Sequence, residues 1–274
     1  MKWQLAETAK DLAAYIRSLD EDLAEPPPAG AVVTAPALSR AGKTAKAAAV
    51  TPAPAAEPAT SPAPLMPSKK TASMDELAEQ VKACRRCGLG SARLNAVFGV
   101  GSRKAKVVFV GEGPGFQEDH KGEPFVGRSG QLLDKILETV LGLKRSDVYI
   151  ANIVKCHPMK NPSDPESHGN DRPPTPDEIA ACRPYLDEQL RAIKPDCIVT
   201  LGSVPTKVLL NTDKGISLMR GRAYDYPVEI VPGRPVKLIP TYHPAALLRN
   251  PNLKRDTWED MKMLKVFLET GKIS

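Results

Sequence analysis

Five cysteines offer the most direct chemistry in this 274-residue chain. Cys84 and Cys87 form a C-x2-C pair, while Cys156 and Cys182 each precede a proline by two residues. A cytosolic chain seldom keeps structural disulfides, so these four thiols predict a metal centre, with ordinary buried thiols as the alternative. Zinc and a 4Fe-4S cluster both take four thiolates, and the spacing does not choose between them. Cys197 lies in the apolar run "DCIVTLG", which indicates a core thiol.

A second candidate site is the glycine-rich, charged segment "GEGPGFQEDHKGEPFVG", residues 111–127, which directly follows the apolar run "VVFV". A nucleotide-binding loop is one interpretation of such a turn, but the spacing matches neither GxGxxG nor GxxxxGK[ST]. Glu118, Asp119 and Glu123 would repel a pyrophosphate, and Pro114 removes one of the amides that such a loop uses. These residues therefore argue against a nucleotide-binding loop.

The third candidate is His243 in "TYHPAALLRNP", residues 241–251. This histidine follows an apolar run and precedes small residues, two leucines and an arginine. A lone His-Pro pair is more often a turn than a catalytic site, so its weight depends on the other two segments.

The elements that must position these residues alternate between strands and helices. Apolar runs at 106–111, 148–155 and 196–202 predict strands, and amphipathic runs at 129–142, 175–193 and 204–211 predict helices, which indicates an α/β domain with a largely parallel sheet. Thr175, before a proline and two acids, predicts the start of the helix 175–193. Two further strands are predicted at 227–233 and 234–244, and a closing helix at 256–270. Ligands of such sheets bind at the carboxyl ends of the strands, where residues 111–127 begin.

The N-terminal part has a different composition. Residues 1–25 predict a short amphipathic helix, either a poorly ordered terminus or a docking helix for a partner protein; residues 26–73 predict a disordered linker rich in alanine and proline; and residues 74–274 form the globular domain. Residues 75–274 hold 30 basic and 25 acidic side chains, a balance that suits an anionic partner without requiring one. Without a signal peptide or an apolar run of membrane-spanning length, we expect a cytoplasmic, monomeric protein with no membrane contact.

Together, "GEGPG", "PFVGRSGQLL", "ANIVKC" and "HPAALL", in this order among the cysteines, resemble the family-four uracil-DNA glycosylases, the iron-sulfur branch of their superfamily. The resemblance covers roughly residues 75–270 and implies a three-layer αβα sandwich around a four-stranded parallel sheet. It implies excision of uracil from single- or double-stranded DNA, leaving an abasic site without strand cleavage. It also implies a 4Fe-4S cluster on Cys84, Cys87, Cys156 and Cys182.

The resemblance further implies roles in base recognition. Glycines in the first motif, Gly113 and Gly115 among them, let the backbone approach a flipped base. Phe125 is similar to the aromatic residue that stacks on uracil, although a core phenylalanine is the alternative. Asn152 is similar to the residue that reads O4 and N3–H, because its amide offers one donor and one acceptor.

His243 is similar to the histidine that faces uracil O2, where a donor stabilises the negative charge of the departing base. Leu247 and Leu248 are similar to the wedge that enters the vacated stack, with helix packing as the alternative, and Arg249 is placed to meet phosphate. The chain departs from the best-known branch of the superfamily, because glycines stand where that branch has a water-orienting aspartate and a thymine-blocking tyrosine. Glu112, nearest to the turn, is therefore the expected water-activating group.

Glu118 and Asp119 are the other candidates for water activation, with surface carboxylates as their alternative, and thymine exclusion must come from elsewhere. The segment 159–174 is longer than the family pattern, and we expect it to bulge outward with His168 in solvent. Two rival functions remain: covalent capture of uracil-DNA through His120, and a non-catalytic iron-sulfur DNA-binding module. The module would not need Asn152 and His243 in register, so their joint presence favours the enzyme.

Overall fold

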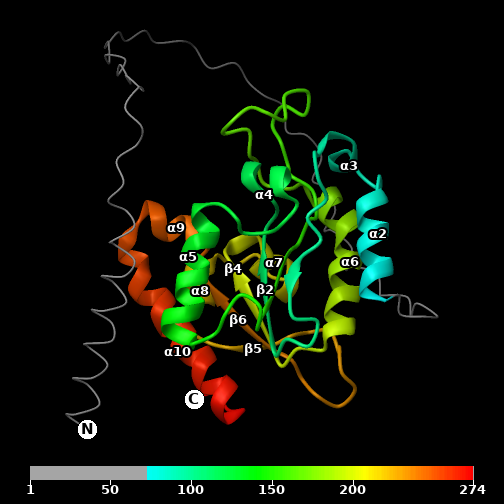
Figure 1. The fold of residues 1–274 in the computed structure, drawn as a ribbon. Coiled ribbons are helices and arrows are strands. Elements are labelled where there is room, and N and C mark those ends of the chain that lie inside the picture. Colours follow the sequence, from blue (N-terminus) through cyan, green and yellow to red (C-terminus); the bar gives the residue numbers. More distant parts are fainter. Residues whose placement is uncertain (1–72, 274) are drawn as a thin grey trace, which may run out of the picture. The chain divides into compact units, whose positions relative to one another are not determined.

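A computed structural model describes residues 73–273 of the chain (Figure 1). The predicted N-terminal helix and nearly all of the predicted linker lie outside the described residues. Among the described helices, none is long and apolar enough to cross a membrane.

The core of the domain is a six-stranded sheet with the order β1-β3-β2-β4-β6-β5. The strands are β1 (Val100–Gly101), β2 (Val107–Gly111), β3 (Tyr149–Asn152), β4 (Cys197–Leu201), β5 (Tyr224–Asp225) and β6 (Lys237–Thr241). The four central strands pair in parallel, while the two-residue strands β1 and β5 pair antiparallel at the edges. The predicted parallel four-stranded sheet is thus confirmed, and two short edge strands extend it.

Helices cover both faces of this sheet, as a parallel sheet with apolar strands requires (Figure 1). Along β2 the side chains alternate between the faces: Val108 and Val110 belong to one core cluster, and Val107 and Phe109 to the other. The first cluster packs under α2 (Met74–Ala83), α6 (Pro176–Ile193) and α7 (Ser203–Leu210). The second packs under α5 (Arg128–Ile136), the π-helical turn η2 (Leu137–Leu141), α9 (Pro244–Arg249) and α10 (Lys254–Thr270). The three-layer αβα arrangement is confirmed.

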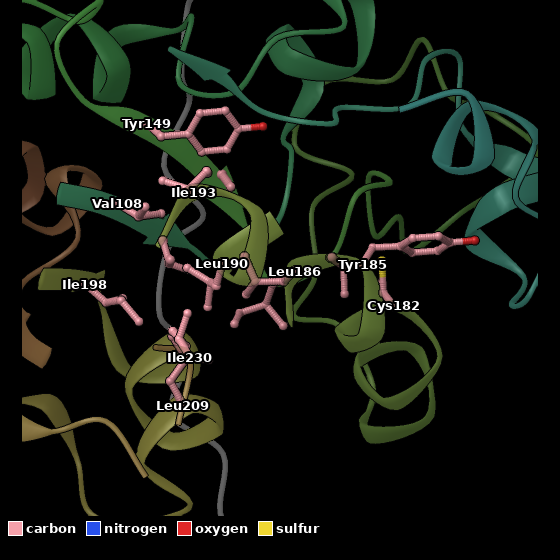
Figure 2. Close-up of a cluster of buried hydrophobic side chains, with 14 of the residues drawn as sticks. Val108, Tyr149, Cys182, Tyr185, Leu186, Leu190, Ile193, Ile198, Leu209 and Ile230 are labelled. Atoms are coloured by element: carbon pink, nitrogen blue, oxygen red, sulfur yellow. The ribbon is translucent and has the colours of Figure 1, made fainter. Parts of the chain in front are cut away.

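The first cluster is drawn in Figure 2, which labels Leu186 and Leu190 of α6 and Ile198 of β4 among its buried side chains. Each fully buried leucine or isoleucine contributes about 1.5–3 kcal/mol relative to exposure, so this face holds α6 firmly against the sheet. At one end of the same cluster lie Tyr185 and Cys182 (Figure 2). The core on this face therefore continues directly into the cysteine region.

Local signals explain where the main helices begin and end. Thr175 caps α6 as predicted: its hydroxyl accepts the N–H of Glu178 at 3.3 Å, and the Glu178 carboxylate accepts the N–H of Thr175 at 2.8 Å. The helix predicted at 129–142 begins at Arg128 and widens into the π-helical turn η2 before Gly142, which ends it in a left-handed conformation.

The strand predicted at 227–233 is wrong. The partner of β6 on that side is β5, Tyr224–Asp225, and Pro227 then interrupts the ladder because it has no N–H to donate. Only Val231 and Arg234 pair across the predicted Pro-Gly turn, as an isolated bridge. The remaining short elements are α3 (Leu89–Ala92), α4 (Phe116–Lys121), α8 (Ile216–Met219) and η3 (Pro251–Leu253).

Candidate active site and cysteine centre

The predicted recognition residues meet at the carboxyl edge of the sheet. Gly111 ends β2 and Asn152 ends β3, and the two residues are partners in the parallel register. His243 follows the end of β6 by two residues and is the N-cap of α9. The topology thus brings together three segments that are far apart in the sequence.

Gly111 is the tightest point of this site. A Cβ atom there would lie 2.4 Å from Asn152 Oδ1 and 2.6 Å from Phe125 Cζ, closer than real Cβ contacts allow. Only glycine therefore lets the Asn152 amide and the Phe125 ring flank the end of β2. At Gly113 the nearest atom to a Cβ is Val154 Cγ2 at 2.8 Å, so this glycine permits packing against the chain after β3. A Cβ at Gly115 would lie 3.2 Å from Glu118 Oε2.

Phe125 is held in an unusual conformation. Its φ of 54° is left-handed, which costs a non-glycine residue about 1–2 kcal/mol. The side chain is 6% exposed and packs in the second core cluster, and its ring centroid lies 5.5 Å from that of His243. The start of α5 presses against this backbone, because a Cβ at Gly130 would lie 1.8 Å from Phe125 O. Strain of this kind, imposed by surrounding structure, is typical of functional sites.

Asn152 has an unused hydrogen-bond acceptor. The residue is 2% exposed, and its Oδ1 has no hydrogen-bond partner among the described residues. A buried acceptor without a partner costs about 1–3 kcal/mol, so a ligand donor would relieve this site. The backbone of Asn152 is fixed separately, because Lys155 Nζ donates to its carbonyl oxygen at 2.9 Å and to Gln189 Oε1 at 2.6 Å.

His243 is a neutral hydrogen-bond donor. Loss of hydration in its protein surroundings, with a smaller effect of the nearby Arg249 cation, lowers the pKa of His243 to about 4. The ring nitrogen Nδ1 accepts the N–H of Ala245 at 3.1 Å, so the proton of the neutral ring is on Nε2. Gly202 after β4 lies against this histidine, since a Cβ there would be 3.2 Å from His243 Cβ.

The three candidate carboxylates have different surroundings. Glu118 accepts backbone N–H groups from Gly115, Val126 and Gly127, at 3.0–3.2 Å, and so joins the two ends of the glycine-rich segment. Asp119 is fully buried and accepts the N–H groups of Leu94 and Asn95. Neither is the surface carboxylate that was the alternative interpretation.

Glu112 differs from these two acids. It is half-buried, it has no hydrogen-bond or ion-pair partner among the described residues, and burial raises the pKa of its carboxyl. Of the three acids it alone keeps its carboxylate available for a substrate or a water molecule.

The leucines after His243 are not equivalent. Leu247 is 0% exposed and packs in the second core cluster with Trp258 and Met261. Leu248 is half-buried and Arg249 is exposed. A DNA contact by Leu247 would require it to leave the core, so packing explains this residue.

The long segment 159–174 was expected to bulge outward; residues 160–164 are exposed, as expected, but the prediction is wrong toward both of its ends. Met159 is 2% exposed and Asn170 6% exposed, and the Asn170 side chain accepts the N–H of Asn161 at 2.8 Å. His168 is exposed, as expected, but its ring contacts Phe116 at a centroid distance of 4.1 Å. The segment folds back onto α4.

His120, the residue suggested for covalent capture, is exposed and contacts the same segment. Its Nδ1 bonds to the carbonyl oxygen of Phe116 at 2.8 Å, and its Nε2 lies 3.0 Å from Glu166 Oε2. Hydrogen bonding to Glu166 is the main reason why the pKa of His120 is raised. A raised pKa favours the protonated ring, and protonation removes the lone pair that a nucleophile needs.

A buried histidine between two aspartates was not predicted. His157 is fully buried; its Nε2 lies 2.6 Å from Asp171 Oδ1, and its Nδ1 lies 3.6 Å from Asp119 Oδ2. Burial lowers the pKa of this ring, but the two aspartates outweigh it and raise the value to about 9. The sequence has no signal for this group, because its members come from three separate segments.

Four of the five cysteines line one cavity, and no disulfide joins any of the five. Cys84 and Cys87 follow α2, Cys156 follows β3, and Cys182 lies in α6. The sulfurs accept hydrogen bonds: Arg93 Nη1 donates to Cys156 at 2.8 Å, and the N–H of Lys155 donates to Cys182 at 3.2 Å. Donors and buried cations of this kind favour anionic thiolates.

These surroundings do not deprotonate the thiols unaided. Burial raises the pKa of Cys156 to about 11, against the opposing effect of Arg93, so the thiolates would form on metal binding. Among residues 73–273, no group of three or more His, Cys, Asp or Glu side chains is arranged to hold a single metal ion. The fifth cysteine, Cys197, is 0% exposed in β4, which confirms the interpretation as a core thiol.

Comparison with known proteins agrees with this geometry. Residues 98–262 match the model of the uracil DNA glycosylase superfamily. The type-4 uracil-DNA glycosylase of Sulfurisphaera tokodaii is 41% identical over 204 residues, which are 73% of this chain and 87% of the relative. Those of Archaeoglobus fulgidus and Thermotoga maritima are each 42% identical, over 70% and 72% of this chain and 92% and 95% of their own lengths. The chain therefore belongs to the uracil DNA glycosylase superfamily and, within it, to the type-4 uracil-DNA glycosylases.

Proposed function

We propose that this protein excises uracil from DNA by hydrolysing its N-glycosidic bond, leaving an abasic site. The observation that carries the proposal is the unpartnered Oδ1 of Asn152, buried beside the Phe125 ring at the edge where the neutral His243 lies. An unsatisfied amide and a stacking ring at one point are what recognition of a flipped pyrimidine requires.

Asn152 selects uracil by its hydrogen-bonding pattern. Its Oδ1 accepts N3–H of uracil, and its Nδ2 donates to O4, whereas cytosine presents the opposite pattern. A buried mismatch costs about 1–3 kcal/mol for each unpaired group, which is enough to reject cytosine without steric exclusion. Phe125 stacks on the same base, and the fixed backbone of Asn152 holds the amide in place.

His243 stabilises the departing base. Breaking the glycosidic bond leaves negative charge on the pyrimidine, and Nε2–H donates to O2 where that charge develops. A neutral ring suits this role, because it keeps the Nε2 proton for donation and the pocket does not have to bury a histidine cation in addition to the charge on the departing base. Loss of one such donor typically lowers the rate about a hundredfold or more.

Glu112 activates or orients the water molecule that attacks C1′. Its carboxylate is the one left without a partner, and its raised pKa makes it a better proton acceptor than an exposed glutamate. Lys155, which follows β3 by three residues, does not offer its amine to the reaction, because it is buried with its Nζ on Asn152 O and Gln189 Oε1. Strand cleavage through an amine adduct is therefore not part of the proposal.

The four cysteines that line one cavity would hold a 4Fe-4S cluster. The donor set of thiols from three segments, with N–H groups and Arg93 directed at sulfur, fits an anionic cluster. When bound, the cluster supplies cross-links between the end of α2, the chain after β3, and α6. Leu248 and Arg249 are the proposed DNA contacts on α9, and a partner of residues 1–25 stays a prediction.

The decisive experiment incubates anaerobically purified protein with a labelled oligonucleotide that carries one uracil, and scores alkali-labile breaks. Thymine-containing DNA and the His243→Ala variant are the controls. Uracil-dependent abasic sites that decrease about a hundredfold in the variant would support the proposal. A uracil-dependent adduct that resists denaturant would instead indicate covalent capture, with His120→Ala as its test. If protein with an intact cluster gave no reaction, the non-catalytic iron-sulfur DNA-binding module would be the favoured function.

A further inference from the structure

Leu218 in α8 is exposed to an unusual degree. Its side chain is 66% exposed, against 41% for Leu94 and 39% for Val266, the other large exposed apolar residues of the described part. Its neighbour Met219 is 6% exposed and anchors the turn in the protein. A single exposed leucine needs no explanation, so its location must decide whether it has a role.

The turn that carries Leu218 lies at the same edge of the sheet as the base pocket. The N–H of Ile216 donates to Ser203 Oγ at 3.3 Å, and Ser203 begins α7 directly after β4. The hydroxyl of Tyr242 lies 3.4 Å from Ser217 Oγ, and Tyr242 directly precedes His243. The turn is therefore attached to the ends of two parallel strands, beside the histidine of the site.

Strong contacts hold this turn in place. Arg220 donates to the two carboxylate oxygens of Asp260 at 2.8 and 3.0 Å, and its guanidinium lies 5.6 Å from the Tyr242 ring centroid. Asp260 also accepts the N–H of Gly221 at 3.0 Å and the hydroxyl of Thr241 at 2.7 Å. Leu218 is thus presented to solvent from a fixed position relative to the end of β6.

The charges around Leu218 suit a nucleic acid. Residues 213–222 contain three basic side chains and one acidic one, Asp213. Arg220 forms ion pairs with Asp256 and Asp260. Lys214 and Arg222, by contrast, are exposed and have no carboxylate partner in the part of the chain that the structure describes. Arg222 also donates to the carbonyl oxygen of Leu218 at 3.1 Å, which places a cation directly beside the exposed leucine. Exposed cations beside an apolar side chain match a strand that offers phosphates and bases.

We propose that Leu218, with Lys214 and Arg222, forms a second DNA contact next to the uracil pocket. Leu218 packs against the bases beside the flipped nucleotide, while the two cations meet phosphates of the same strand. This inference rests on the proposed excision of uracil from DNA. It assigns the apolar contact to a side chain that already faces solvent, whereas Leu247 is 0% exposed in the core.

The test compares Leu218→Ala with Val266→Ala, a matched truncation of an exposed apolar residue in α10. Binding is measured by fluorescence anisotropy on a duplex with a tetrahydrofuran abasic analogue, which requires no chemistry, and excision by single-turnover kinetics. Leu218→Ala is expected to weaken binding and slow excision about tenfold, with no effect of Val266→Ala. Lys214→Gln and Arg222→Gln should each reduce the salt dependence of binding.

Wild-type affinity in Leu218→Ala would overturn the inference, as would an equal loss in Val266→Ala. The two measurements also separate this inference from the proposed function. If the wild-type protein excises uracil and Leu218→Ala matches it in both binding and excision, only the proposed contact by Leu218 is refuted. If the wild-type protein binds the abasic duplex without excising uracil, the proposed function fails, and the contact is judged on affinity alone.

Discussion

Replacing Gly111 by alanine is expected to damage uracil excision more than it damages the fold. The added Cβ would lie 2.4 Å from Asn152 Oδ1 and 2.6 Å from Phe125 Cζ, while real Cβ contacts almost never fall below 3.0 Å. The amide must therefore retreat by at least 0.6 Å, the difference between 3.0 and 2.4 Å, and the ring by at least 0.4 Å, the difference between 3.0 and 2.6 Å. Both groups recognise the base in the proposed mechanism, so one methyl group displaces them together.

The size of the effect follows from that displacement. A misplacement of about 1 Å in a catalytic site can lower the rate about a hundredfold, and we expect a loss of ten- to a hundredfold, roughly, in single-turnover excision. Overpacking costs about 1–3 kcal/mol of folding free energy, which leaves most small domains folded at 25 °C. Activity and stability should thus separate in this variant.

The assay follows uracil excision under single-turnover conditions and urea unfolding of the same preparations. Gly88→Ala is the control, because nothing lies within 4 Å of a Cβ at that position and its φ of −57° suits alanine. Wild-type excision by Gly111→Ala would refute the claim that this glycine makes room for the Asn152 amide and the Phe125 ring. Equal losses in both variants would show that glycine replacement harms the protein for a reason unrelated to the site.

Three further outcomes test the assignments. Because the pKa of His243 is lowered to about 4, the ring should stay neutral above pH 5, and the excision rate should not change there through titration of this histidine. The folded protein should lose stability as pH falls from 6.5 toward 4, because the histidine of the unfolded chain binds a proton in this range and the folded one does not. A His243-dependent rate that titrates near pH 6.5 would contradict this. Leu247→Ala should lower the free energy of unfolding in urea by about 2–5 kcal/mol and Leu248→Ala by less, and the reverse order would be against the core role of Leu247. Cys156→Ser should lower the iron content and visible absorbance of anaerobically purified protein, and unchanged iron would remove this cysteine from the proposed cluster.

Much of the fold could be predicted because its signals are local. The Thr175 cap, the left-handed Gly142 and the apolar strands each act within a few residues, so the sequence predicts where elements begin and end. The strand at 227–233 failed because an apolar pattern does not show that Pro227 interrupts the ladder with β6. Similarly, the helical spacing of Leu247 and Leu248 does not show which of the two faces the core.

Other parts of the site depend on contacts between distant segments. No periodicity predicts that His157 lies between Asp119 and Asp171, or that Phe125 takes a left-handed φ of 54° under the start of α5. The resemblance to the family-four motifs implied Asn152 and His243, and the structure places both residues at the same edge of the parallel sheet. They did not predict the unpartnered state of the Asn152 amide, because that depends on what surrounds it.

The chain after β3 connects the two centres of the molecule. Asn152, Lys155, Cys156 and His157 lie within six residues, so the amide proposed to read the base and a cysteine of the proposed cluster share one short segment. Lys155 strengthens this connection: it is 1% exposed, its Nζ donates to Asn152 O, and its N–H donates to Cys182 Sγ. Burial lowers the pKa of Lys155 to about 8, and thiolates at Cys182 and Cys156, which would form on metal binding, would oppose this lowering and favour the charged lysine. We therefore expect the cysteine centre to support the proposed base recognition through the backbone of Asn152, although it lies on the α2 and α6 side of the sheet.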